Sequence, residues 1–134
     1  MFEDLTLMAM ARKKLDWLAR RQEVLAENIA NANTPKYQAK DLQALSFKDV
    51  LKQDAQPVRA VATDSRHISP PVEPVKFQVE TERSPEESKP DGNSVLLEEQ
   101  MGKMGDVKND YEMVSNLLQK NMAMLKTALG KNGG

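Results

Sequence analysis

Few residues in this chain are of the types that carry out chemistry. His67 is the only histidine, and the 134 residues include no cysteine. A catalytic histidine needs a nucleophile or an orienting group beside it, and no nucleophile elbow, glycine-rich phosphate loop, EF-hand or HExxH pattern occurs. The acidic pairs Glu86-Glu87 and Glu98-Glu99 are best explained as solvated charge. The sequence therefore predicts no enzyme activity, no cofactor and no metal site.

Asn28, Asn31 and Asn33 are a second unusual set, spaced closely before Pro35. Asparagine accepts the left-handed conformation that ends helices, so these residues are first interpreted as a helix stop. Three of them, separated by small residues, also suggest amides that bond backbone groups in a close packing contact. Under the second interpretation, Asn31→Ala and Asn33→Ala weaken assembly, and Asn28→Ala is milder because it lies a turn earlier.

The segment before these asparagines has the pattern of a long amphipathic helix. Steps of three and four residues, from Met8 to Ala32, meet apolar side chains at every position except Gln22. This spacing forms the buried seam of a coiled coil. A flank containing Trp17 and Val24 makes the apolar face wider than one partner helix covers. The apolar members of the seam are Met8, Ala11, Leu15, Leu18, Leu25, Ile29 and Ala32.

A second helix is predicted near the C-terminus. Asp91-Gly92-Asn93 indicates a turn, and Asn93 or Ser94 is suited to cap the helix that follows. A seam of the same spacing then runs to Leu129, beside a flank that includes Val107 and Val114. Gly102 and Gly105 weaken this helix by about 1 kcal/mol each relative to alanine. The apolar members of the seam are Leu97, Met101, Met104, Tyr111, Leu118, Met122, Leu125 and Leu129.

The middle of the chain has a different composition. Six of the seven prolines lie between residues 55 and 91, which excludes helix over most of this stretch. Residues 37–42 are expected to form an extended arm that turns back along the first helix. A short helix is predicted at 47–53, capped by Ser46, and one edge strand at 72–79.

The composition and net charge of the chain exclude some classes of function. Hydrophobic residues make up 40% of the chain, aromatic residues 4%, and the net charge is −1. A nucleic-acid-binding protein would carry a basic excess, so no nucleic-acid partner is expected. No small-molecule substrate is expected either. The N-terminus lacks a cleavable secretory signal pattern, and no apolar run approaches the roughly 20 residues of a membrane span.

These patterns predict a mainly α single domain over residues 1–134. Two long terminal amphipathic helices, at 1–34 and 93–130, pack as an antiparallel coiled-coil-like pair. An extended arm and an irregular proline-rich middle, at 35–92, hold at most one or two short strands. Since two helices cannot cover faces this wide, the exposed faces are expected to pack against other subunits.

The asparagine stretch resembles the N-terminal signature of the flagellar axial proteins, which include rod, hook and hook-associated subunits. Asn28-Ile-Ala-Asn-Ala-Asn-Thr-Pro-Lys-Tyr37 matches their N-I-A-N-x-N-T-P-x-Y run. Residues 18–28, Tyr37–Leu42, Thr63–Ile68 and Asp91–Val95 resemble further stretches of the small rod subunits. The resemblance covers about half of the chain, mostly at its two ends.

The resemblance implies a structural subunit of the proximal rod, within the periplasmic part of the flagellar basal body. Such a subunit is exported by the flagellar type III apparatus without a cleaved signal peptide. Its implied partners are copies of itself, the rod protein FlgC, the adaptor FliE and the basal MS ring. Its packing residues would be Met8, Leu15, Leu18, Leu25, Asn28, Ile29, Asn31, Asn33, Pro35, Tyr37, Leu97, Met101, Met104, Tyr111, Leu118, Met122 and Leu125.

One alternative from another class stays open at this point. A soluble coiled-coil adaptor or flagellar export chaperone would also expose wide apolar helix faces. Such an adaptor should form a folded helical oligomer when purified. A rod subunit should be a monomer whose isolated helices are weak.

Overall fold

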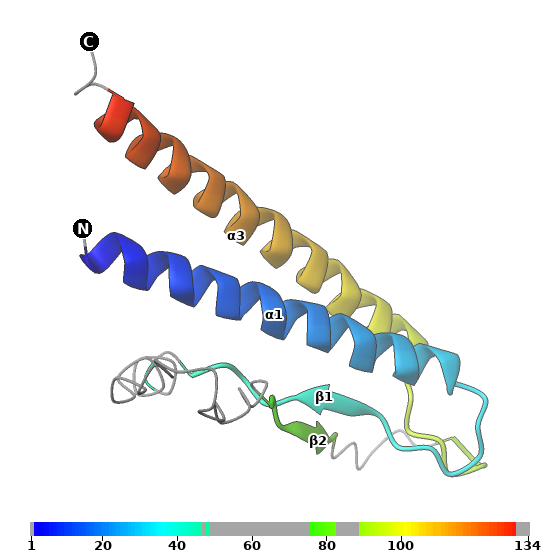
Figure 1. The fold of residues 1–134 in the computed structure, drawn as a ribbon. Coiled ribbons are helices and arrows are strands. Elements are labelled where there is room, and N and C mark those ends of the chain that lie inside the picture. Colours follow the sequence, from blue (N-terminus) through cyan, green and yellow to red (C-terminus); the bar gives the residue numbers. More distant parts are fainter. Residues whose placement is uncertain (1, 47, 49–75, 83–88, 131–134) are drawn as a thin grey trace, which may run out of the picture.

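The structure is a computed structural model that describes residues 2–46, 48, 76–82 and 89–130. Its elements are the helix α1 (Phe2–Ala30), the strands β1 (Lys40–Leu42) and β2 (Val79–Thr81), and the helix α3 (Leu97–Gly130). The two helices run antiparallel, so both chain ends lie at the same end of the pair (Figure 1). The two-stranded sheet lies along one side of α1. This arrangement confirms the predicted fold class.

Helix α1 ends at Ala30, where the asparagine-rich stretch begins. The backbone N–H of Asn31 lies 3.1 Å from the Glu27 carbonyl and 3.2 Å from the Asn28 carbonyl. Such a shared bond is common in a last helical turn. A turn from Thr34 to Tyr37 then reverses the chain, with Lys36 in the left-handed region at φ 59°. The helix stop predicted for the asparagines is therefore present.

The extended arm follows this turn and packs on α1, as predicted. Its strand β1 pairs antiparallel with β2, and Asp41 lies opposite Glu80. Bonds from Gln43 N–H to Gln78 and from Glu82 N–H to Ala39 extend the ladder at both ends. The strand predicted at 72–79 shares only Val79 with β2, because the pairing register is set by the arm. Residues 72–75 of that prediction lie outside the described residues.

A small apolar core joins α1, the arm and α3. Its centre is formed by side chains that are almost or fully buried, and Leu18 and Leu25 have no exposed surface. Each such leucine contributes about 1.5–3 kcal/mol through its removal from water. The buried members are Trp17, Leu18, Val24, Leu25, Leu42 and Val107, with Leu45, Phe77 and Met104 packed against them.

Helix α3 begins at Leu97, four residues later than predicted. Asn93 and Ser94 do not cap it, because both side chains have other partners. The Asn93 side-chain oxygen accepts from Val95 N–H at 2.8 Å, and the Ser94 hydroxyl accepts from Ala39 N–H at 2.9 Å. The predicted cap was therefore wrong in its role, although both residues do join the two ends of the chain.

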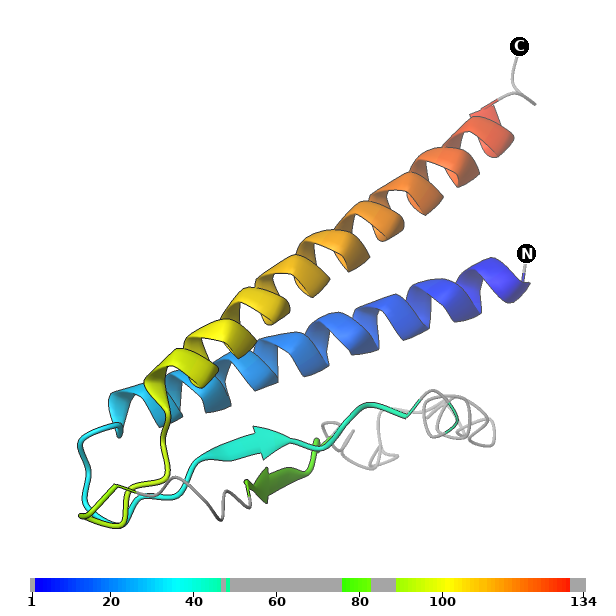
Figure 2. The same ribbon diagram turned by 180° about the vertical axis from the view of Figure 1, so that it is seen from behind.

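The two helices are close beside the turns and separate toward the chain ends (Figures 1 and 2). None of the described helices is long and apolar enough to cross a membrane. Several predictions fall outside the described residues. They concern most of the short helix at 47–53, His67 with the Thr63–Ile68 stretch, and the Glu86-Glu87 pair.

Candidate functional site

Asn28 is the centre of a polar junction between α1, the arm and α3. Its side chain is fully buried and makes four hydrogen bonds. The amide nitrogen donates to the Lys40 carbonyl at 2.6 Å and to the Gln100 side-chain oxygen at 2.8 Å. The amide oxygen accepts from Lys40 N–H at 3.0 Å and from the Tyr37 hydroxyl at 3.2 Å. All donors and acceptors of this amide are therefore in use.

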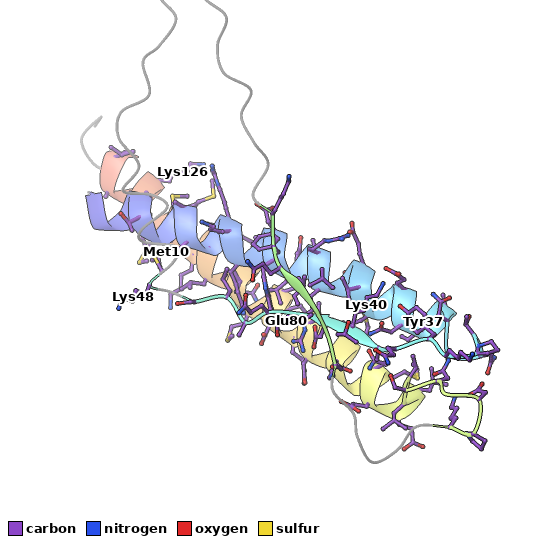
Figure 3. The ribbon with its side chains drawn as sticks, turned by 90° about the horizontal axis from the view of Figure 1, so that it is seen from below. Met10, Tyr37, Lys40, Lys48, Glu80 and Lys126 are labelled. Atoms are coloured by element: carbon purple, nitrogen blue, oxygen red, sulfur yellow. The ribbon has the colours of Figure 1, made fainter. Side chains whose placement is uncertain are left out.

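The bonds from Asn28 to Lys40 copy a backbone pairing. The amide meets both the N–H and the carbonyl of one residue, as a neighbouring strand would. Tyr37 and Lys40 lie together near the end of α1, where the arm starts (Figure 3). Burial raises the pKa of the Tyr37 hydroxyl, and the nearby Glu27 carboxylate adds to the effect. Tyr37 therefore stays protonated and donates to Asn28.

Asn93 makes a second link between the chain's two ends. Its buried amide nitrogen donates to the carbonyls of Asn31 at 2.9 Å and Thr34 at 2.7 Å. The Asn31 side chain itself donates to the Glu27 carbonyl and accepts from the Thr34 hydroxyl. These two carbonyls also accept the backbone N–H groups of Thr34 and Tyr37, so the D-G-N stretch before α3 adds a second bond to each of them.

The backbones of the two turns also meet directly. Lys36 N–H donates to the Asp91 carbonyl and Ser94 N–H donates to the Tyr37 carbonyl, both at 3.0 Å. Gly92 has a φ of 80°, and a Cβ there would lie 3.5 Å from the Lys36 Cα. Glycine at this position provides the left-handed conformation, whereas a Cβ would make only an ordinary contact with Lys36. We call the contacts of residues 28–40 with residues 91–100 the junction.

A cluster of charges borders the junction. Arg21 forms a two-pronged pair with Asp41, with nitrogen–oxygen distances of 3.0 and 2.9 Å. Lys103 from α3 pairs with Glu82, lies 3.0 Å from Glu99 and 3.8 Å from Asp41. Each of these groups except Glu99 is mostly shielded from water. The pairs therefore hold the two-stranded sheet against both α1 and α3.

The acid–base properties of the cluster follow from these pairs. Burial alone would raise the pKa of Asp41, but hydrogen bonds from Arg21 and Leu42 N–H, with the charges of Arg21 and Lys103, lower it. Burial alone would lower the pKa of Lys103, but its bonds to Glu82 and Glu99 raise it. Both groups therefore stay charged in the folded chain at neutral pH.

The predicted packing residues fall into groups of different exposure. Leu18, Leu25 and Asn28 are buried within the chain itself, where they hold the fold together. Asn33 and Pro35 are exposed at the turn. The remaining seam residues of α1 and α3 in the predicted set are half-buried or exposed. These are Met8, Leu15, Ile29, Met101, Met104, Tyr111, Leu118, Met122 and Leu125, with Leu97 at the start of α3.

The expected order of the asparagines concerns rod assembly and stays a prediction. Within the subunit, Asn28 is the asparagine that is fully buried and bonded on all sides. The Asn33 side chain is exposed. Asn28 is buried because it faces the returning arm. The interpretation that amides satisfy backbone groups in a close contact agrees with Asn28, whereas the Asn31 side chain bonds only the end of its own helix and the turn after it.

The stripe of α3 that is buried against α1 is not the seam that the sequence predicted for packing. The buried residues recur every seven positions and are Gln100, Val107, Val114 and Asn121. The Leu97–Leu129 seam lies on one side of this stripe. Met101 is 61% exposed and Tyr111 is 49% exposed, so the chain covers little of that seam by itself.

An open apolar hollow lies between this seam and α1. Its volume is about 650 Å³, and we call it the groove. A second hollow at the open end of the pair continues along the same stripes, from Met8 on α1 to Met122, Leu125 and Leu129 on α3. The residues that line the groove include Gln22, Ile29, Met101, Met104, Lys108, Tyr111 and Glu112.

Several residues of the junction and of the charge cluster beside it were not predicted as site residues. Gln100, Asn93, Ser94, Arg21, Asp41 and Lys103 all join different elements. Of these residues, only Asn93 and Ser94 belong to a local pattern that the sequence shows, which is the Asp91-Gly92-Asn93 turn. The Asn28–Gln100 bond joins residues 72 positions apart, which no short-range pattern reveals. Among the described residues, no group of histidine, aspartate and glutamate is arranged to hold a metal ion.

The family model that matches this chain and the three relatives described below are all flagellar basal body rod proteins. Residues 15–38 match the family model described as "Flagella basal body rod protein". The flagellar basal body rod protein FlgB of Agrobacterium fabrum is 34% identical over 87% of both chains. FlgB of Escherichia coli is 33% identical over 76% of this chain and 77% of its own, and FlgB of Bacillus subtilis is 27% identical over 81% of both. Because two of these relatives are at least 33% identical over three quarters or more of both chains, the chain belongs to the FlgB family of flagellar basal body rod proteins.

Proposed function

We propose that this chain is a subunit of the proximal rod that transmits torque through packed helices. The observation that carries this proposal is the groove, with its mostly apolar lining at the side of the helix pair. An apolar surface of this kind is costly to leave in water and marks a place where another protein packs. The junction keeps α1 and α3 in one register, so a load on one helix passes to the other.

The proposed partners are copies of the chain, the rod protein FlgC, the adaptor FliE and the MS ring. The proposed site of assembly is the periplasm, after export by the flagellar type III apparatus without cleavage of a signal peptide. No catalytic step is part of this proposal. Buried contacts, repeated over many subunits, would supply the stiffness that a rotating shaft needs.

The first test follows the protein in cells that lack the native gene. A tagged copy should restore swimming and should copurify with isolated basal bodies, with its N-terminal residue still in place. A copy that stays in the cytoplasm as a helical oligomer would instead support an adaptor or chaperone role.

A second test addresses torque. Leu118→Ser lowers the apolar contact of the α3 seam without adding charge. Cells carrying it should still build rods, but tethered cells should stall or break at high viscous load sooner than wild-type cells. Asn116→Ser, at an exposed position on the same helix, is the matched control. Equal rotation of both variants at all loads would argue against torque transfer through this seam.

A further inference from the structure

A further apolar hollow, which we call the arm hollow, lies where α1, α3 and the end of the arm meet. Its volume is about 250 Å³. Of the described residues that line it, only Lys14 is polar, and the Lys14 ammonium lies 4.3 Å from the centre of the Trp17 ring. This attraction draws the charge toward the ring, and a lysine so placed can line an apolar surface with its methylene chain. The described lining consists of Leu7, Met10, Ala11, Lys14, Leu45, Val114 and Leu117.

The arm hollow is open because the two helices separate toward the chain ends (Figures 1 and 2). On α3, Val114 is only 9% exposed, whereas Leu117 in the next turn is 48% exposed. On α1, Leu7 is 38% exposed. Leu7 and Leu117 therefore leave apolar surface in water, and apolar side chains placed between them would remove it.

The arm leads the chain directly to this hollow. The Trp17 indole N–H donates to the Gln43 carbonyl at 3.0 Å, which fixes the arm on α1 two residues before Leu45 enters the lining. Lys48 is helical and exposed, and it lies toward the N-terminal end of α1 (Figure 3). Phe47 follows Leu45 by two residues, so the backbone allows at most about 7 Å between their Cα atoms. The segment that follows Leu45 therefore starts at the mouth of the arm hollow.

The sequence of this segment fits an apolar site of this size. At 100° per residue of a helix, Phe47, Val50 and Leu51 fall within about 100° of one another, while Lys48 and Lys52 share another side. The exposed side chain of Lys48 agrees with this division. A dry protein cavity of about 150 Å³ holds a benzene molecule, so the arm hollow has room for the Phe47 ring and an aliphatic side chain.

We propose that Phe47, Val50 and Leu51 fill the arm hollow and complete a second small core between α1, α3 and the arm. A segment tethered at Leu45 has a high effective concentration at the hollow, which gives it an advantage over any separate molecule. The contact lies within one chain, so it forms in the free subunit and does not depend on assembly.

Disulfide formation within the purified full-length chain tests the contact, because the chain has no cysteine of its own. Leu51→Cys is combined with Leu7→Cys on α1 or with Leu117→Cys on α3, and each double variant is oxidised mildly at low protein concentration. Lys52→Cys with the same two partners is the matched control, since the chain brings residue 52 equally near but on another side of the segment. A disulfide forms only when the Cβ atoms come within about 4.5 Å, so its rate reports contact.

At least one Leu51→Cys pair should form an intramolecular disulfide about five-fold faster than the corresponding Lys52→Cys pair. Equal rates would overturn the proposal. Disulfide-linked dimers in excess of crosslinked monomers would also overturn it, because they would place a second copy in the arm hollow. The measurement is made on the free chain, so a failure of the proposed function in cells would leave this result unchanged.

The equilibrium constant for unfolding gives an independent measurement that needs no crosslink. Phe47→Ala removes the largest proposed occupant and should raise this constant about ten-fold or more. Lys48→Ala, at the exposed neighbouring position, should change it by less than about two-fold. Urea denaturation followed by circular dichroism measures both variants. If Phe47→Ala has no larger effect than Lys48→Ala, this segment does not fill the arm hollow.

Discussion

At the residue scale, the side-chain amide of Asn28 pairs with the arm as the backbone of a neighbouring strand would. Asn28 offers a donor and an acceptor to the backbone of Lys40 and a second donor to Gln100. No other uncharged side chain except glutamine has this pattern, and glutamine is one methylene too long for a contact this close. Aspartate has the same shape but cannot donate to either oxygen.

Asn28→Ala should lower the free energy of unfolding by about 2–4 kcal/mol, because it leaves the buried Lys40 and Gln100 groups without partners. Denaturation of the purified chain, followed through the fluorescence of its single tryptophan, measures the loss. Asn33→Ala is the control, since that side chain is exposed, and should change stability by less than about 0.5 kcal/mol. Equal effects from the two variants would contradict the role given to Asn28.

At the element scale, the two turns of the junction hold the helices by close backbone contact. Gly92 is in the left-handed region and faces the Lys36 backbone. Gly102, in contrast, lies inside α3 with nothing near the place where a Cβ would sit. The two glycines therefore differ in what a methyl group would do.

Gly92→Ala should destabilise the chain by about 1–2 kcal/mol, because a residue with a Cβ is strained at a φ of 80°. Gly102→Ala should stabilise it by about 1 kcal/mol through better helix propensity. Thermal unfolding by circular dichroism would show shifts of opposite sign. A stabilised Gly92→Ala variant would mean that the junction does not constrain this turn.

The second prediction at this scale concerns Asp41 of the arm and how stability depends on pH. Because the pKa of Asp41 is lower in the folded chain than its ordinary value of 3.8, its carboxylate stabilises the fold above that pH. The contribution is lost as the pH falls through the lowered pKa. Asp41→Asn should cost about 1–3 kcal/mol at pH 7 and should flatten the loss of stability below pH ~4. Denaturation curves at several pH values test this, with Asp16→Asn, at an exposed position of α1, as control.

At the scale of the whole molecule, two leucines of the predicted seams separate folding from assembly. Leu25 is fully buried in the core, whereas Leu118 is half-buried on α3, seven residues after Tyr111 of the groove. Leu25→Asp should prevent folding, at a cost of several kcal/mol. Leu118→Asp should leave the purified chain folded but prevent its incorporation into basal bodies. Circular dichroism and basal-body yield together distinguish the two, and loss of folding in both variants would refute the division.

The sequence was informative where the controlling forces are local. Proline, asparagine and the 3-4 spacing determine where α1 and the arm lie, and they were predicted correctly. The stripe that α3 buries was harder to identify, because two of its members, Gln100 and Asn121, are polar. The more apolar seam beside it faces the groove. A periodic pattern shows that a face is buried, but it does not distinguish burial within a chain from burial between chains.

The junction has a mechanical consequence, because it closes only one end of the pair. Residues 2 and 130 lie at the other end, where the helices already diverge (Figure 1). Force that draws these two residues apart loads one turn at a time and peels the helices from each other. Force between residues 2 and 97 would have to slide all the contacts at once. Pulled through cysteine handles in an optical trap, the chain should open at markedly lower force in the first geometry. A subunit built in this way yields easily to a pull on its end and resists a load along its axis.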